Sequence, residues 1–132
     1  MKLAEDVYSV TGQMPPEEKF ALTRQIRDCS TSISANIAEG SGRGGTAELI
    51  YFLWVANGSR CELETRLILA HRLKLIGEID EILTESERIG MMLMRLIASL
   101  KRRLKSRMDE WDVPPDGPNT IHVPPRSTNH GP

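Results

Sequence analysis

The chain has 132 residues, of which 39% are hydrophobic and 27% are charged, and its formal net charge is -1. This length suits one domain with a real core, and the near-zero charge excludes the uniformly basic surface of a strong nucleic-acid binder, although a local basic patch stays open. Aromatic residues make up only 5%. Aliphatic side chains must therefore fill the interior, which favours packed helices over a sandwich.

The first ten residues contain Glu5 and Asp6, where a secretion signal would need an apolar core. The longest apolar run, Leu49 to Ala56, is far too short to cross a bilayer. We therefore expect a cytoplasmic protein without a membrane partner. Cys29 and Cys61 show neither C-x-x-C nor Cys/His spacing, so we expect packing cysteines, with no metal and no cofactor.

Apolar periodicity predicts a short first helix from Lys2 to Thr11, with Gly12 near its end. Pro15-Pro16-Glu17-Glu18 is typical of a helix N-terminus, because proline lacks the amide that is left unpaired there and the acids favour the helix dipole. The second helix is expected to run from there to Glu39. Its apolar stripe consists of Phe20, Thr23, Ile26, Ser30, Ile33 and Ile37.

The third helix is predicted from about Ala47 to Lys74, with Thr46 as its N-cap. One face carries a continuous apolar stripe, and further apolar residues widen that stripe, which predicts burial on a second side. These additional residues are Ile50, Trp54, Cys61, Ile68 and Leu69. The fourth helix is expected from about Glu78 to Arg107, with Gly77 at its start, and Met91, Met92 and Met94 are interpreted as packing or interface residues.

No strand pattern competes with these helices, and short connections favour antiparallel neighbours. The sequence therefore predicts an all-α protein, an antiparallel up-and-down four-helix bundle in residues 1–112. The proline-rich residues 113–132 are expected to form an irregular tail. Because the first helix is too short to cover its share of the bundle, an apolar strip should stay exposed, and association between subunits is the expected cover.

The glycine-rich run from Gly40 to Gly45 formally matches the G-x-G-x-x-G pattern of dinucleotide-binding loops. That fingerprint needs a preceding strand, whereas a helix precedes these glycines, so a helix-to-helix turn is the better interpretation. Arg43 beside the exposed amides could still meet a phosphate. No serine has a histidine partner within the bundle, so we expect no catalytic residues and no enzyme activity.

A cluster of cations marks the end of the fourth helix, and two interpretations stay open. Cations at a helix C-terminus complement the helix dipole, which makes a solvated end the simpler interpretation. The alternative is a phosphate-contacting patch, which repetition around an oligomer would strengthen. The candidate nucleic-acid contacts are Arg24, Arg27, Arg43, Lys101, Arg102, Arg103, Lys105 and Arg107.

Two sequence runs resemble one known family: the run from Ser32 to Gly40, which ends in Asn-Ile-Ala-Glu-Gly, and the run from Gly58 to Thr65, which contains Glu-Leu-Glu. The chain resembles the bacterial four-helix-bundle proteins that include the one encoded in intervening sequences of large-subunit ribosomal RNA genes. The likeness covers about residues 3–105. The motif residues are Asn36, Glu39, Gly40, Glu48, Glu62 and Glu64.

The resemblance implies an up-and-down bundle that assembles as a ring-like homopentamer and has no enzyme activity. It extends to the accessory protein of diversity-generating retroelements, a basic protein that binds nucleic acid and works with a reverse transcriptase, so RNA or DNA and a protein partner are the alternative expectation. The chain departs from the family pattern at Ser34, where members have proline, and members carry additional residues before Leu3. The first helix is therefore expected to be truncated, or the start of the chain to be misassigned.

Overall fold

The structure, a computed structural model, describes residues 1–18 and 21–112, with side chains up to residue 109. It contains four α-helices: α1 (Lys2–Thr11), α2 (Leu22–Gly42), α3 (Thr46–Arg72) and α4 (Asp80–Asp112). A 3-10 turn, η1 (Pro16–Glu18), lies between α1 and α2. The described residues contain no strand, which confirms the all-α prediction. The expected tail, residues 113–132, lies outside the described residues.

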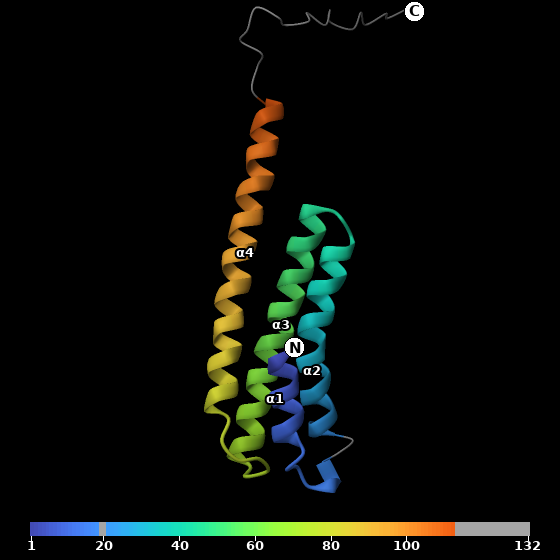
Figure 1. Cartoon of the computed structure of the whole chain (residues 1–132), viewed down its shortest axis with the longest axis vertical. Coiled ribbons are helices and arrows are strands. Elements are labelled where there is room, and N and C mark those ends of the chain that lie inside the picture. Colours follow the sequence, from blue (N-terminus) through green and yellow to red (C-terminus); the bar gives the residue numbers. More distant parts are fainter. Residues whose placement is uncertain (19–20, 113–132) are drawn as a thin grey trace, which may run out of the picture.

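The helices form an up-and-down bundle in which α1 packs against α2 and α4, and α3 packs against the same two helices. Its centre consists of aliphatic side chains with no exposed surface, among them Val7, Ile26, Leu53, Leu63 and Leu67. Burying a side chain of this size contributes about 1.5–3 kcal/mol, so this core carries most of the favourable energy of folding. Figure 1 shows that α1 covers only one end of the bundle, whereas α4 extends beyond the loop between α2 and α3.

Several predicted helix ends were wrong. The second helix begins at Leu22 rather than at the proline pair, because Pro16 belongs to the separate 3-10 turn, and Phe20 lies outside the described residues. It also continues past Glu39 to Gly42. The turn itself is centred on Gly44, whose φ of 78° favours glycine because it lies in the left-handed region.

The long helices also begin and end differently from the predictions. Thr46 is the first residue of α3 and makes no capping hydrogen bond; Gly45 occupies the N-cap. The C-terminus of α3 is Arg72, and Lys74 follows in the left-handed conformation with φ 59°, while the Leu75 amide returns to Ala70 O at 3.0 Å. This is a Schellman-type ending. The last helix begins at Asp80 and runs to Asp112, beyond the predicted end at Arg107.

None of the helices in the described part of the chain combines the length and the apolar character that a membrane crossing requires.

Candidate interaction surfaces

The polar motif residues of α2 tie that helix to α3. Asn36 Nδ2 donates to the carbonyl oxygen of Ser32 at 2.8 Å and to its hydroxyl at 2.9 Å, and that hydroxyl lies 2.9 Å from Ser59 Oγ on α3. Further along α2, a Cβ on Gly40 would lie 2.7 Å from the Cβ of Phe52. Glycine therefore permits a close helix contact, and these residues set the register of α2 against α3.

A second polar network joins α3 to α4. Arg60 Nη1 and Ser86 Oγ both donate to Glu64 Oε1, at 2.6 and 2.7 Å, and Arg60 Nε donates to Asn57 Oδ1 at 2.9 Å. The side chains of Arg60 and Glu64 are only 14% and 27% exposed. Gly90 leaves room for the guanidinium, because a Cβ there would lie 2.6 Å from its central carbon. This ion pair and its hydrogen bonds join α3 to α4, and they are not an acid–base pair open to a substrate.

The other motif carboxylates lie on the bundle surface. Glu39 pairs with Arg43 at 2.7 Å, Glu62 pairs with Arg66 at 3.4 Å, and Glu48 occupies the first turn of α3, where the helix dipole favours an acid. The six motif residues thus do not converge on one cavity. Among residues 1–18 and 21–109, no group of three or more His, Cys, Asp and Glu side chains is placed to hold a metal ion.

The two thiols differ in access. Cys29 is buried, and its sulfur accepts a hydrogen bond from Arg66 and lies 3.5 Å from Glu62 Oε2. Burial is the main cause that raises the pKa of Cys29, and the charge of Arg66 opposes it. Cys61 is exposed on α3. A single copy of the chain therefore offers one accessible thiol.

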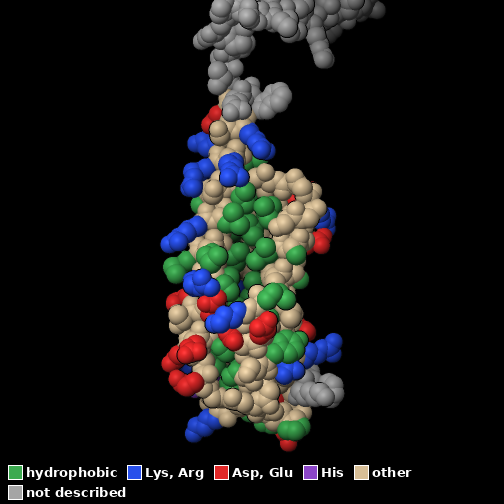
Figure 2. All heavy atoms as spheres, in the orientation of Figure 1, with side chains coloured by type: hydrophobic (Ala, Val, Ile, Leu, Met, Phe, Trp, Pro, Cys, Tyr) green, Lys and Arg blue, Asp and Glu red, His purple; other side chains and the backbone are tan. Residues whose placement is uncertain are grey.

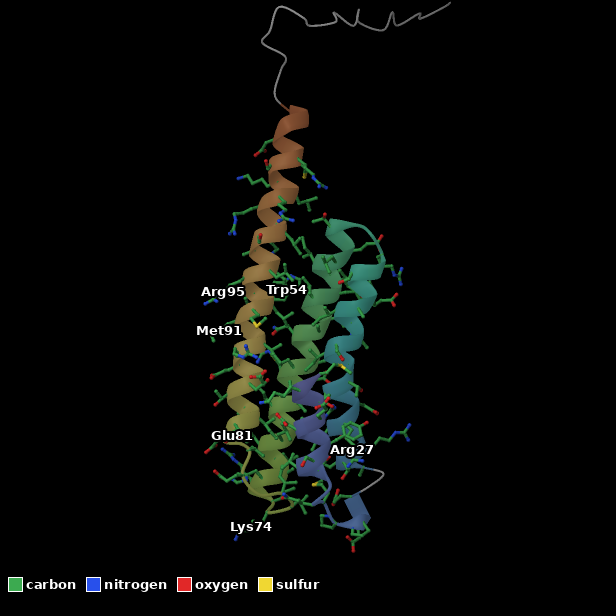
Figure 3. The ribbon with its side chains drawn as sticks, viewed as in Figure 1. Arg27, Trp54, Lys74, Glu81, Met91 and Arg95 are labelled. Atoms are coloured by element: carbon green, nitrogen blue, oxygen red, sulfur yellow. The ribbon has the colours of Figure 1, made fainter. Side chains whose placement is uncertain are left out.

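The candidate cations fall into two groups at opposite ends of the bundle. Arg24 pairs with Asp28 at 3.8 Å near the start of α2. Arg27 lies over the Tyr8 ring, 4.5 Å from its centroid, and donates to Thr11 Oγ1 at 2.9 Å, so it clamps α1 onto α2 (Figure 3). The start of α2 and the C-terminal end of α4 lie at opposite ends of the bundle (Figure 1).

The other group lies at the opposite end, where α4 projects. Five cations there are exposed and make no ion pair with any side chain of residues 1–18 and 21–109: Lys101, Arg102, Arg103, Lys105 and Arg107. Lys101 lies over Trp54 of α3, with its ammonium 5.4 Å from the ring centroid. Arg43, at the same end of the bundle, is already paired with Glu39. Among the candidate cations in the described part of the chain, those at the end of α4 are the group without ion pairs (Figure 2).

The outward face of α3 carries a stripe that we call the α3 seam. Its members alternate spacings of four and three residues and are all exposed, and none is charged: Ala47, Tyr51, Trp54, Gly58, Cys61, Thr65 and Ile68. Tyr51 is 63% exposed and Trp54 is 44% exposed. Of the second apolar side predicted for this helix, Ile50 is half-buried against the core, whereas Trp54, Cys61, Ile68 and Leu69 are exposed. The prediction missed Ala47, Tyr51 and Thr65, although the four-three spacing in the sequence could have revealed them.

A second apolar surface lies beyond the N-terminal end of α1. There a groove of about 410 Å³ opens between α2 and α4, with Met1 at the end next to α1. Its walls and floor are almost entirely apolar: Ile33 and Ile37 from α2, Leu53 from α3, and Ile89, Met92, Leu93 and Leu96 from α4. Figure 2 shows these side-chain types gathered on this face. The groove is the uncovered strip that the short first helix predicts.

The sequence model of the family described as "23S rRNA-intervening sequence protein" matches residues 1–95. The chain belongs to the 23S rRNA-intervening sequence protein family. This confirms the resemblance found in the two motif runs. Among solved structures, the family member is similar to a protein of unknown function from the S23 ribosomal protein family of Bacteroides thetaiotaomicron, with 28% identity and a TM-score of 0.66. The match covers 73% of this chain and 92% of that chain. No curated protein matches this member of the intervening sequence protein family.

Proposed function

We propose that this protein is a non-catalytic subunit of a homo-oligomer that acts as an interaction scaffold, and that its copies associate through the α3 seam. The observation that carries the proposal is the exposed, uncharged stripe from Ala47 to Ile68. Apolar residues on a second side of a helix normally indicate that this side is buried too, and a four-three repeat is the pattern by which helices pair. The family resemblance implies five copies in a ring.

Gly58 supports the same face. A Cβ at this position would meet no atom within 4 Å, so the single chain does not need a glycine there. Glycine inside a helix costs about 1 kcal/mol relative to alanine, and its use is explained if a neighbouring helix approaches closely at this point. Gly58 lies near the middle of the α3 seam, which is where such a crossing would be centred.

Light scattering coupled to size exclusion tests the proposal. The wild-type protein should elute as an oligomer at micromolar concentration, and Trp54→Glu should shift it to a smaller species because the change places a charge in the seam and removes that contact. Met108→Glu is the matched control, since Met108 is also exposed but lies on α4 away from the seam. A monomeric wild type would refute the proposal.

A second candidate function is nucleic-acid binding, favoured by the unpaired cations on the projecting end of α4. Binding to a single-stranded RNA should weaken steeply as salt rises, because each neutralised phosphate releases counterions. The double change Arg102→Glu and Lys105→Glu should abolish binding at low salt. Arg24→Glu, at the other end of the bundle, should leave it unchanged. Absence of binding by the wild type at low salt would exclude this function.

A further inference from the structure

Charge is segregated along α4 and the residues that lead into it. The five ionised residues from Glu78 to Glu87 are all carboxylates, and the next seven, from Arg88 to Arg107, are all cations. The helix dipole accounts for charges in the first and last turn only, and the last turns here carry Asp109 and Asp112. Two charge blocks of this length therefore need another cause.

One side of α4 crosses both blocks and the apolar groove between them. Six residues spaced alternately by four and seven lie on this side: Glu81, Glu85, Met92, Leu96, Arg103 and Arg107. The side is acidic at the start, apolar in the middle and basic at the end (Figure 2). Met92 is 55% exposed and Leu96 is 43% exposed, and both line the groove.

Two charged residues of this side, Glu81 and Arg103, are available for a partner. Glu81 is exposed, makes no ion pair with any described residue, and lines a second cleft with Asp6, Glu78 and Asp80 at the start of α4. Arg103 is exposed and similarly unpaired within the described part of the chain. Glu85 differs, because its carboxylate already accepts hydrogen bonds from Arg88 at 2.7 and 3.0 Å.

The groove itself suits an apolar occupant. Its two serine hydroxyls are already used, since Ser30 Oγ donates to Arg27 O at 2.7 Å and Ser34 Oγ donates to Thr31 O at 3.2 Å. No charged side chain lines the groove. A nucleic acid would use the cations but would leave this groove open and would be repelled by Glu81.

We propose that the groove and its flanking charges bind α4 of a second copy of this chain, running antiparallel, with the two-fold axis close to Met92. Glu81 and Arg103 are each eleven residues from Met92, about 16 Å along the helix, so each would face the other residue in the second copy. The contact is self-complementary and covers the apolar centre on both copies. A parallel pairing would instead place cation against cation and acid against acid.

This contact goes beyond the proposed association through the α3 seam and uses another face of the bundle, so the two can fail separately. The α3 seam is uncharged and should tolerate salt, whereas the α4 contact should weaken as salt screens its charges. Sedimentation velocity at about 50 mM and about 500 mM salt separates the two contributions in one protein.

A charge exchange tests the antiparallel arrangement. Glu81→Arg and Arg103→Glu should each weaken the salt-sensitive association by about tenfold or more, because each single change turns two attractive pairs into two repulsive ones. The double variant Glu81→Arg/Arg103→Glu restores opposite charges and should recover association to within about threefold of the wild type. A double variant as weak as the single variants, or single variants without effect, would overturn the proposal.

A cysteine at the axis gives an independent readout. In a Cys61→Ser background, Met92→Cys should form disulfide-linked dimers on mild oxidation, because the two copies of residue 92 would face each other. Ala98→Cys, exposed on a different side of α4, should not. The same result is expected with Trp54→Glu added, which removes the α3 contact. Equal cross-linking at both positions would contradict the two-fold contact.

Nucleic-acid binding would use the same cations as the proposed α4 pairing. The charge-exchange variants distinguish the two. If Arg103→Glu abolishes binding of a single-stranded RNA, and Glu81→Arg/Arg103→Glu neither restores that binding nor affects association, the face is a nucleic-acid site. The proposed pairing would then be wrong.

Discussion

At the scale of single residues, the glycines of this bundle divide into those that one chain requires and those that it does not. Gly40 is buried against Phe52 of α3, and its missing Cβ lets the two helices approach. Gly58 is exposed, with open space where its Cβ would be. The same residue type thus serves an internal contact in α2 and, in our account, a contact between subunits in α3.

Alanine at the two positions should therefore have opposite effects on the isolated chain. In the Trp54→Glu background, Gly58→Ala should raise the free energy of unfolding by about 0.5–1 kcal/mol, because alanine favours the helix. Gly40→Ala should lower the free energy of unfolding, because the new methyl group would meet Phe52. Denaturant unfolding measures both. A destabilising Gly58→Ala would show that this glycine serves the fold of one chain.

The polar network between α3 and α4 gives a second prediction at this scale. Glu64→Leu should lower the free energy of unfolding by about 2 kcal/mol or more, because it leaves Arg60 and Ser86 without their shared acceptor in a largely buried setting. Arg24→Met removes the pair with Asp28, in which both side chains are 72% exposed, and should cost less than about 1 kcal/mol. Equal costs would mean that burial does not distinguish the two pairs.

At the scale of the helices, α1 is the shortest α-helix and depends on α2 and α4 for its attachment. It is short, and part of its attachment is polar, through the contacts that Arg27 makes with Tyr8 and Thr11. A helix of this length is not stable alone, so its docking holds it folded. Local opening of the bundle should therefore begin with α1.

Hydrogen exchange of the α1 amides tests this view. Arg27→Ala should accelerate exchange in α1 by about fivefold or more, because it removes a cation–π contact and a hydrogen bond that together are worth about 1–2 kcal/mol. Arg24→Ala, which breaks only an exposed pair with Asp28, should leave α1 unchanged. If both changes accelerated hydrogen exchange in α1 equally, the proposed role of Arg27 in holding α1 against α2 would be wrong.

The helix boundaries show how much of the fold could be predicted from the sequence. The four helices followed from apolar spacing, and α1 matched its predicted bounds because Gly12 and the prolines interrupt the pattern there. The end of α2 was missed because Gly40 suggested a break, whereas it serves a close packing contact with α3. The end of α4 was missed because the cations up to Arg107 were interpreted as a last turn, although no proline occurs before Pro114.

The candidate surfaces were only partly predictable, for a physical reason. The extra apolar residues of α3 and the strip above the short first helix follow from periodicity and length. The separation of Arg24 and Arg27 from the end of α4 also follows from the predicted up-and-down topology, in which α2 and α4 run in the same direction. The pairing of Arg43 with Glu39 was missed because the second helix was predicted to end at Glu39, which left Arg43 outside it.

At the scale of the whole molecule, one chain leaves two apolar surfaces open, the α3 seam and the groove above α1. Both are long and run along the bundle, so a partner that covers them should also be helical and elongated. Copies of the same chain meet that requirement. The two surfaces differ in their surroundings, because charged blocks flank only the groove.

The reactivity of Cys61 towards a thiol reagent tests the α3 seam most directly. Cys61 lies within the seam and is exposed on one chain, whereas Cys29 is buried and its pKa is raised, so Cys29 should react slowly in every folded form. We predict that the assembled wild type shows no fast thiol and that the Trp54→Glu variant shows one. A wild-type oligomer in which Cys61 reacts as fast as in that variant would contradict the account.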